Sequence, residues 1–258
     1  MKLTIVKVGG NVIEDEVALS NFLTQFSALD SAKILVHGGG VLAAELAQQL
    51  GIEQQMINGR RVTDSETLKI ITMVYAGFIN KSVVAKLQAL QQNAVGLSGA
   101  DGNVISADKR SEKPINFGYV GDVKAVHEKF LMTLIQEGCI PVIAPLSHDG
   151  KGTLLNVNAD TIAREIAIAM SAHIEVNVVY CFDKKGVLED VNNEDSVIPS
   201  LSFEEYQKGL ANKQIHAGMI PKLDNAFEIA KKGVKVSLGK ATDVLSLSKG
   251  TAGTRKKI

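Results

Sequence analysis

Cysteine, surplus charge and long apolar runs are all scarce in this sequence, and each shortage excludes a class of protein. Only two cysteines occur in 258 residues, Cys139 and Cys181, and both lie in apolar segments. Secreted scaffolds held by disulfides use more cysteines, and a zinc site needs ligands at a close spacing that neither cysteine shares with any histidine. We therefore interpret both as buried thiols of a cytoplasmic protein and predict no metal site built from the chain.

The balance of charge excludes a second class. Lys and Arg together number 28, as do Asp and Glu, so the formal net charge is zero, and the cations are scattered along the chain. Nucleic-acid backbones bind proteins that present a net positive footprint. We predict no nucleic-acid partner and expect a small-molecule substrate.

No segment predicts export or membrane insertion. The first ten residues, MKLTIVKVGG, contain only a short apolar run before two glycines and no small-residue cleavage site, unlike a signal peptide. No run approaches the roughly 18 apolar residues that span a bilayer. These features predict a cytoplasmic protein with no membrane partner.

Short runs rich in Val, Ile and Leu alternate with segments of helical periodicity. Strands are predicted at 3–8, 33–36, 94–97, 140–144, 176–182 and 234–238, and helices at 12–29, 42–50, 64–91, 128–137, 161–171, 203–212 and 222–232. This alternation predicts a single α/β domain, with helices on both faces of a mainly parallel sheet. Thr63 and Glu66 predict a capping box at the third helix. The polar stretches 101–116 and 189–196 are predicted to be hairpins or surface excursions.

Two glycine clusters each follow a predicted strand directly. They are Lys7-Val8-Gly9-Gly10 and His37-Gly38-Gly39-Gly40. Glycine lets a phosphate approach bare backbone N–H groups, and the helix that follows adds its positive N-terminal dipole. Because ligands bind at the carboxyl ends of parallel strands, the two clusters predict a polyphosphate site with Lys7 at its lip. The sequence contains neither a P-loop nor a G-x-G-x-x-G motif.

Three further motifs carry polar residues near predicted helix starts. They are Asn156-Val157-Asn158-Ala159-Asp160, Asn58-Gly59-Arg60-Arg61-Val62-Thr63 and Met219-Ile220-Pro221-Lys222. A helix N-cap accounts for one of Asn156, Asn158 and Asp160 but less well for all three. The arginine pair suits a substrate carboxylate, and equally a solvated basic spot. Pro221 suits the first turn of a helix, where a ligand phosphate would explain the unfavourable charge of Lys222.

Together these motifs resemble the amino acid kinase family, over the chain from Lys7 to Arg255. The resemblance implies a three-layer αβα sandwich, with the acyl amino acid bound by residues 1–172 and ATP by residues 173–258. The residues of these motifs are similar to those of family members that transfer the γ-phosphoryl group of ATP to the γ-carboxylate of N-acetyl-L-glutamate, a step of arginine biosynthesis. It also implies that Mg²⁺ is carried by the nucleotide and that a homodimer forms through the predicted helix 64–91.

The resemblance assigns roles to individual residues. Lys7 and Lys222 would flank the transferring phosphoryl group, and Asp160 would hold both lysines. Arg61 and Asn156 would bind the carboxylates of the substrate. The other residues would line the site, with Gly39, Gly40 and Asn158 on the substrate side and Gly9, Gly10, Gly38 and Asp183 on the nucleotide side.

Two alternatives stay open. Arg60 stands where the family has an apolar residue. If its guanidinium faces the site, N-succinyl-L-glutamate is favoured over N-acetyl-L-glutamate as substrate; if it faces solvent, Arg60 does not distinguish the two. An α/β-hydrolase would use the HGGG segment as an oxyanion hole and Ser98 as nucleophile. However, the residues after Ser98 (GADGN) do not predict the helix that a nucleophile elbow requires.

Overall fold

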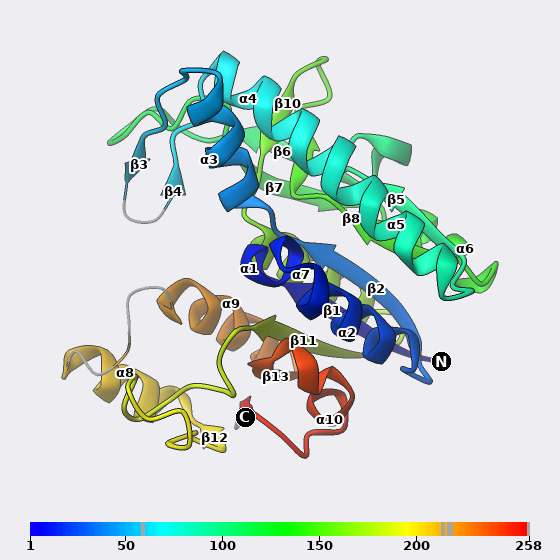
Figure 1. Ribbon diagram of the computed structural model, residues 1–258, viewed down its shortest axis with the longest axis vertical. Helices are drawn as coiled ribbons and strands as arrows, with labels where there is room; N and C mark the ends of the chain where they lie inside the picture. The colour runs from blue at the N-terminus through cyan, green and yellow to red at the C-terminus, as the bar shows by residue number, and fades with distance from the viewer. Residues whose placement is uncertain (58–59, 213–214, 216–218, 257–258) are drawn as a thin grey trace.

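The computed structural model describes residues 1–57, 60–212, 215 and 219–256, and its centre is one large sheet (Figure 1). The eight strands lie in the order β12-β14-β13-β11-β1-β2-β8-β5, and all neighbours are parallel except β13 and β14. Their bounds are β1 Lys2–Val8, β2 Ala32–His37, β5 Ala94–Leu97, β8 Ile140–Ile143, β11 Glu175–Phe182, β12 Ser200–Leu201, β13 Lys235–Lys240 and β14 Thr254–Lys256. Every strand predicted from an apolar run is present in this sheet, because burial on both faces favours a predominantly apolar run.

Helices cover both faces of the sheet and enclose two apolar cores. One face carries α6 (Glu128–Gln136), α7 (Ala159–Ser171), α8 (Phe203–Ala211) and α9 (Ile220–Ala230). The other carries α1 (Gly10–Glu14), α2 (Glu16–Ser27), α3 (Gly40–Gln49), α10 (Val244–Lys249) and a long helix made of α4 (Ser65–Ile71), η1 (Thr72–Ile79) and α5 (Asn80–Ala89). The three-layer αβα sandwich is therefore confirmed.

Two predicted helix starts are wrong in detail. The segment 12–29 forms two helices, because Asp15 is extended and its carboxylate accepts hydrogen bonds from the N–H groups of Val17 and Ala18 at the start of α2. The long helix is capped by Asp64, which accepts from Thr67 N at 2.7 Å, rather than by Thr63. Thr63 instead pairs with a neighbouring segment through a bridge to Gly118.

Two small sheets lie at the end of the molecule that carries α3 and α4 (Figure 1). One has the order β10-β9-β6-β7, with β6 at Ile105–Lys109, β7 at Gly121–Val126, β9 at Leu146–His148 and β10 at Leu154–Asn156. The other pairs β3 (Met56–Ile57) with β4 (Arg60–Arg61). The polar stretch predicted at 101–116 contributes only the first strand of a hairpin, since β6 pairs antiparallel with β7, which lies wholly beyond it.

The long helix, Ser65–Ala89, is strongly apolar. By length and composition alone its 25 residues, with a mean hydropathy of 1.3 over an 18-residue window, are sufficient to cross a membrane. This is weak evidence, because a core helix of a globular protein passes the same test. One side of the helix packs into the core through Ile71, Ile79 and Val83, and 39% of the window is buried.

The two cysteines differ in their surroundings. Both are free thiols, and Cys181 lies buried in β11 as predicted. Cys139 is only half-buried, and its sulfur accepts a hydrogen bond from Asn93 Nδ2 at 3.3 Å.

Candidate active site

Two glycine turns lie against each other at the carboxyl ends of β1 and β2. The Gly38 N–H donates to Val8 O at 3.0 Å, and the Gly9 N–H donates to Cys181 O at 3.1 Å. A Cβ placed on Gly38 would lie 3.1 Å from Gly10 N, and one placed on Gly10 would lie 3.6 Å from Gly39 N. The predicted juxtaposition of the two clusters is confirmed, and the tight contact is at Gly38, where the neighbouring backbone would have to shift to admit a Cβ.

Gly39 is required by the packing of the long helix. A Cβ at this position would lie 2.3 Å from Ile79 Cδ1 and 3.1 Å from Tyr75 Cδ1, both in the η1 segment. Real Cβ atoms essentially never show contacts under 3.0 Å, so a larger residue would force the Ile79 side chain, the turn or the helix to shift.

A carboxylate links two lysines next to these turns. Lys7 comes from the end of β1, Asp160 from the first turn of α7 and Lys222 from the first turn of α9. Asp160 Oδ1 lies 2.7 Å from Lys7 Nζ, and Asp160 Oδ2 lies 3.6 Å from Lys222 Nζ. The side chains of Lys7 and Asp160 are buried, whereas that of Lys222 is 22% exposed. The three residues predicted to act together therefore do lie together.

The charges of this cluster sum to one surplus positive charge. Burial by itself raises the pKa of Asp160, but the charges of Lys7 and Lys222 outweigh burial and hold that pKa below its ordinary value of 3.8. Burial lowers the pKa of Lys222, and the charge of Asp160 opposes this shift. Asp160 is thus ionised between two cations, and the cluster favours an anionic ligand.

Asn158 lies at the amino end of α7 and holds the backbone of Asp160 in place. Its Oδ1 accepts hydrogen bonds from the N–H groups of Asp160 at 2.8 Å and Thr161 at 3.3 Å, so it is the N-cap of this helix. Asn156, at the end of β10, instead donates from Nδ2 to Thr63 Oγ1 at 3.0 Å. The two asparagines of this motif therefore contact different elements.

Arg61 lies over the second glycine turn. Its Nη2 donates to Gly40 O at 2.7 Å, and its Nη1 donates to Gln54 Oε1. Tyr75 lies beside this guanidinium, and burial raises the pKa of the Tyr75 hydroxyl. No signal in the sequence pointed to Gln54 or Tyr75, because neither stands in a motif.

Arg60 faces away from Arg61. Both residues form β4, which is a strand rather than the predicted helix entry, and successive side chains of a strand point to opposite faces. Arg60 is exposed while Arg61 is half-buried. This geometry favours the alternative in which Arg60 faces solvent, and a substrate site shared by both guanidinium groups stays a prediction. Asn58 and Gly59 of the same motif lie outside the described residues.

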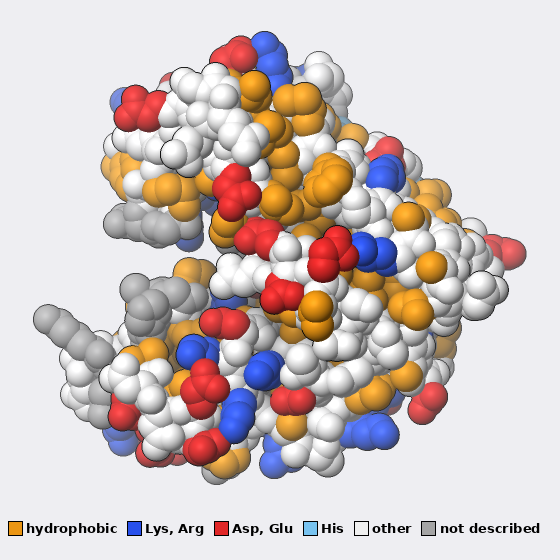
Figure 2. Space-filling view, viewed as in Figure 1, with side chains coloured by type: hydrophobic (Ala, Val, Ile, Leu, Met, Phe, Trp, Pro, Cys, Tyr) orange, Lys and Arg blue, Asp and Glu red, His pale blue; other side chains and the backbone are white. Residues whose placement is uncertain are grey.

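Asp183 and the start of α9 border the Lys222 side of the cluster. Asp183 follows β11, is exposed, and lies close enough for its charge to raise the pKa of Lys222. Pro221 occupies the first turn of α9, as predicted. Figure 2 shows the molecule hollowed on the side where the part carrying β3 and β4 faces the part carrying α8 and α9.

The hydrolase alternative does not fit the geometry around Ser98. Its N–H and hydroxyl both donate to Asp101 Oδ2, at 2.6 and 2.7 Å. The chain then continues through a single 3-10 turn (η2, Asp101–Asn103) into β6 instead of entering a helix. Ser98 is thus a turn residue rather than an exposed nucleophile.

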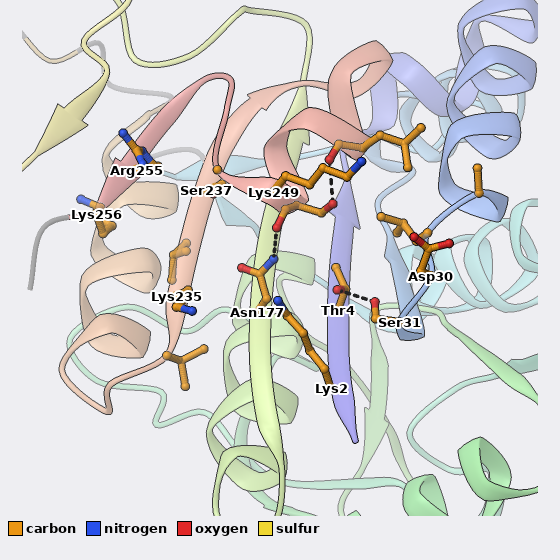
Figure 3. Close-up of a pocket in the computed structure, with 17 residues that line it drawn as sticks. Lys2, Thr4, Asp30, Ser31, Asn177, Lys235, Ser237, Lys249, Arg255 and Lys256 are labelled. Atoms are coloured by element: carbon orange, nitrogen blue, oxygen red, sulfur yellow. Dashed lines mark hydrogen bonds between the residues drawn. The ribbon is translucent and has the colours of Figure 1, made fainter.

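A separate cavity of about 480 Å³ lies at the opposite edge of the sheet (Figure 3). Its floor includes Thr4, Asn177 and Ser237, near the amino ends of β1, β11 and β13, and Lys249 lies at its rim. Substrates of α/β sheets bind beyond the carboxyl ends of the strands, so this cavity is not the site of the chemistry.

The fold and the charged cluster together are those of an α/β protein with a cationic, glycine-lined site at the carboxyl ends of its parallel strands. Residues 2–239 match the model of the amino acid kinase family. An acetylglutamate kinase of Phocaeicola vulgatus is 55% identical over 233 residues, which make up 90% of this chain and 91% of that protein. The chain belongs to the amino acid kinase family.

Solved structures share the same fold at low identity. N-acetylglutamate synthase from Neisseria gonorrhoeae, complexed with coenzyme A and N-acetyl-glutamate, superposes with a TM-score of 0.84 and 20% identity, over 99% of this chain and 59% of that one. Carbamate kinase from Giardia lamblia bound to AMP-PNP gives a TM-score of 0.72 and 13% identity, over 98% and 97% of the two chains. These likenesses support the architecture and leave the substrate to be argued from the site.

Proposed function

We propose that this protein transfers the γ-phosphoryl group of ATP to the γ-carboxylate of N-acetyl-L-glutamate, as a cytoplasmic enzyme of arginine biosynthesis. The observation that carries the proposal is the Lys7–Asp160–Lys222 cluster beside two touching glycine turns. The name of the Phocaeicola vulgatus relative, acetylglutamate kinase, supports the same substrate.

The two ligands would occupy different parts of the chain. The acyl amino acid binds within residues 1–172, where Arg61 lies over Gly40 and Asn156 contacts Thr63. The nucleotide binds against residues 173–258, with Lys222 and Asp183 near its phosphates. The AMP-PNP held by the Giardia lamblia protein of the same fold supports a nucleotide as donor.

The reaction needs no general base in this site. The substrate γ-carboxylate, with an ordinary pKa of about 4.3, is ionised at pH 7. One of its oxygens attacks the γ-phosphorus, the bond from that phosphorus to the β-phosphate oxygen breaks, and ADP leaves without transfer of a proton. Two anions must approach in line, so the main task of the protein is to position them and offset their charge. Lys7 and Lys222, both paired with Asp160, supply that charge from two different elements.

Mg²⁺ would arrive with the nucleotide. Among the residues that the structure describes, no three His, Cys, Asp or Glu side chains are grouped so that they could hold a metal ion, and the Asp160 carboxylate is already paired with two lysines. Magnesium commonly binds through substrate phosphates, where it neutralises charge on the leaving group.

Hydroxylamine trapping tests the proposal, because an acyl phosphate gives a hydroxamate. With Mg·ATP, N-acetyl-L-glutamate should give more product than N-succinyl-L-glutamate, glutamate or aspartate. ATP consumption with hydroxyl or nucleotide acceptors alone would refute the assignment. In the same assay Lys7→Ala should lower kcat by roughly 10²–10³, the usual loss for one preorganised charged donor, with a smaller change in KM.

The protein would act as a homodimer joined through the long helix. Met73 and Phe78, both in η1, are 55% and 66% exposed, and Figure 2 shows hydrophobic side chains gathered over this helix. An exposed apolar stripe of this kind is stabilised by a second copy. Light scattering should give twice the 27.6 kDa mass of the chain, and Phe78→Lys should shift that mass towards the monomer.

A further inference from the structure

A histidine and an asparagine are completely buried behind the second glycine turn. His37 ends β2 and Asn80 begins α5, and both have 0% exposure. Neither contacts the lysine cluster, so the proposed chemistry does not use them directly. Burying two polar side chains in an apolar layer is unfavourable unless their hydrogen bonds are satisfied.

The hydrogen bonds of Asn80 are compatible with only one orientation of its side-chain amide. Lys81 Nζ donates to Asn80 Oδ1 at 3.1 Å, which identifies the oxygen. Asn80 Nδ2 carries two hydrogens: one is donated to Val142 O at 2.9 Å, and the other points to His37 Nε2 at 3.1 Å. His37 Nε2 is therefore an acceptor.

The protonation of His37 follows from this. Burial lowers the pKa of His37 to about 4, so the ring is neutral at pH 7 and carries a single proton. Because Nε2 accepts, the proton is on Nδ1, which donates to Gly38 O at 2.8 Å. The carbonyl of Gly38 is thus held towards the buried ring.

The direction of that carbonyl sets the direction of the next amide. In a trans peptide the C=O of one residue and the N–H of the next point to opposite sides. With Gly38 O turned towards His37, the Gly39 N–H points away from the core. Within the described part of the chain this N–H donates to no protein acceptor, and Gly39 N lies close to the first glycine turn, 3.6 Å from a Cβ placed on Gly10.

The same contact ties the turn to the long helix. Asn80 directly follows η1, a π-helical segment whose wider turn places Ile79 against Gly39 and Asn80 against His37. Such π-helical insertions are often found at functional sites. A one-residue change in helix register would break both contacts.

We infer that His37 and Asn80 are positioning residues, which hold the Gly38–Gly39 peptide so that the Gly39 N–H is aimed at a phosphoryl oxygen between the two glycine turns. This inference rests on the proposed function for the identity of the ligand. The hydrogen-bond geometry itself does not depend on that function.

Nuclear magnetic resonance of the full-length protein tests the geometry without any assay of activity. Ring ¹⁵N shifts should show the neutral Nδ1–H form of His37 at every pH from 6 to 9. In Asn80→Asp the carboxylate accepts from Nε2, so His37 should gain a second proton, its pKa should rise towards neutrality, and the Gly39 amide resonance should shift. Asn177→Asp is the matched control, since Asn177 is another buried asparagine, 3% exposed, that donates to Ser248 O at the far edge of the sheet. An Nε2–H form in the unaltered protein would overturn the inference, even if Asn80→Asp failed to fold.

Kinetics then tests the consequence for phosphoryl transfer. Asn80→Asp should lower kcat at least about tenfold at pH 8, with KM for the acyl amino acid little changed, and activity should recover as the pH falls and His37 is protonated. His37→Asn, which keeps a donor near the Nδ1 position, should retain more activity than His37→Leu. A pH profile of Asn80→Asp parallel to that of the unaltered protein would refute the inference. Absence of hydroxamate in the unaltered protein would refute the proposed function and leave the resonance test decisive for the geometry.

Discussion

Replacing Asp160 by Asn removes one negative charge from between two lysines and changes little else in size. At an effective dielectric constant of about 20, the attraction of Asp160 is about 6 kcal/mol across the 2.7 Å to Lys7 and about 5 kcal/mol across the 3.6 Å to Lys222. The cost of burying the ions cancels much of this attraction, and removing one partner from a buried ion pair costs about 3–5 kcal/mol. We expect Asp160→Asn to lower the free energy of unfolding by about that amount.

Urea unfolding at several pH values measures this effect. The folded-state pKa of Asp160 lies below its unfolded value of 3.8, so its stabilising contribution is present in full above about pH 4 and is lost as the pH falls through the lower folded value. The difference between the two proteins should therefore be constant from pH 5 to 7 and shrink below pH 4. Mg·ATP should restore part of the lost stability in Asp160→Asn, because its phosphates supply the missing negative charge.

The control for this experiment is Asp108→Asn. Asp108 pairs with Lys124 at 3.3 Å on the surface, with both side chains more than half exposed, and exposed pairs contribute between about 0 and 1 kcal/mol. Equal losses for the Asp160 and Asp108 variants, or a loss under about 1 kcal/mol for Asp160→Asn, would refute the claim that one buried carboxylate organises both lysines.

Three further predictions concern single side chains. Arg61→Ala should raise KM for N-acetyl-L-glutamate about tenfold or more with little change for ATP, whereas exposed Arg60→Ala should leave both unchanged; an effect of Arg61 on ATP alone would contradict its placement. Asn158→Ala should lower the free energy of unfolding by about 1 kcal/mol through loss of the α7 cap, and a fall in kcat without that loss would place Asn158 in contact with substrate. Lys256→Met should stabilise the fold by about 1–3 kcal/mol at pH 7, since Lys256 Nζ is buried without a hydrogen-bond partner and burial lowers its pKa to about 6. That gain should shrink as the pH rises towards 10.5, where the unfolded lysine also loses its charge, and a gain independent of pH would show that packing is its cause.

Local patterns were sufficient to predict the elements that build the central sheet. A parallel strand buried on both faces is predominantly apolar, so β1, β2 and β11 stand out in the sequence without knowledge of their neighbours. The same holds for the glycine turns, since a strand that ends in bare backbone and leads into a helix is visible within four residues. Lys7, Asp160 and Lys222 could be proposed because each stands at such a strand or helix end.

Only the tertiary structure decided which side chains meet. Arg60 and Arg61 are neighbours in sequence, but their side chains point to opposite faces of a strand that pairs with residues 56 and 57. A strand of two residues has too short a pattern to be predicted from the sequence. Thr63 and Asn158 carry similar capping signals, but Thr63 is engaged in a bridge to Gly118 while Asn158 is free to cap α7. The pairing of His37 with Asn80 depends on the π-helical turn before Asn80, which sets helix register through long-range packing rather than through any local preference.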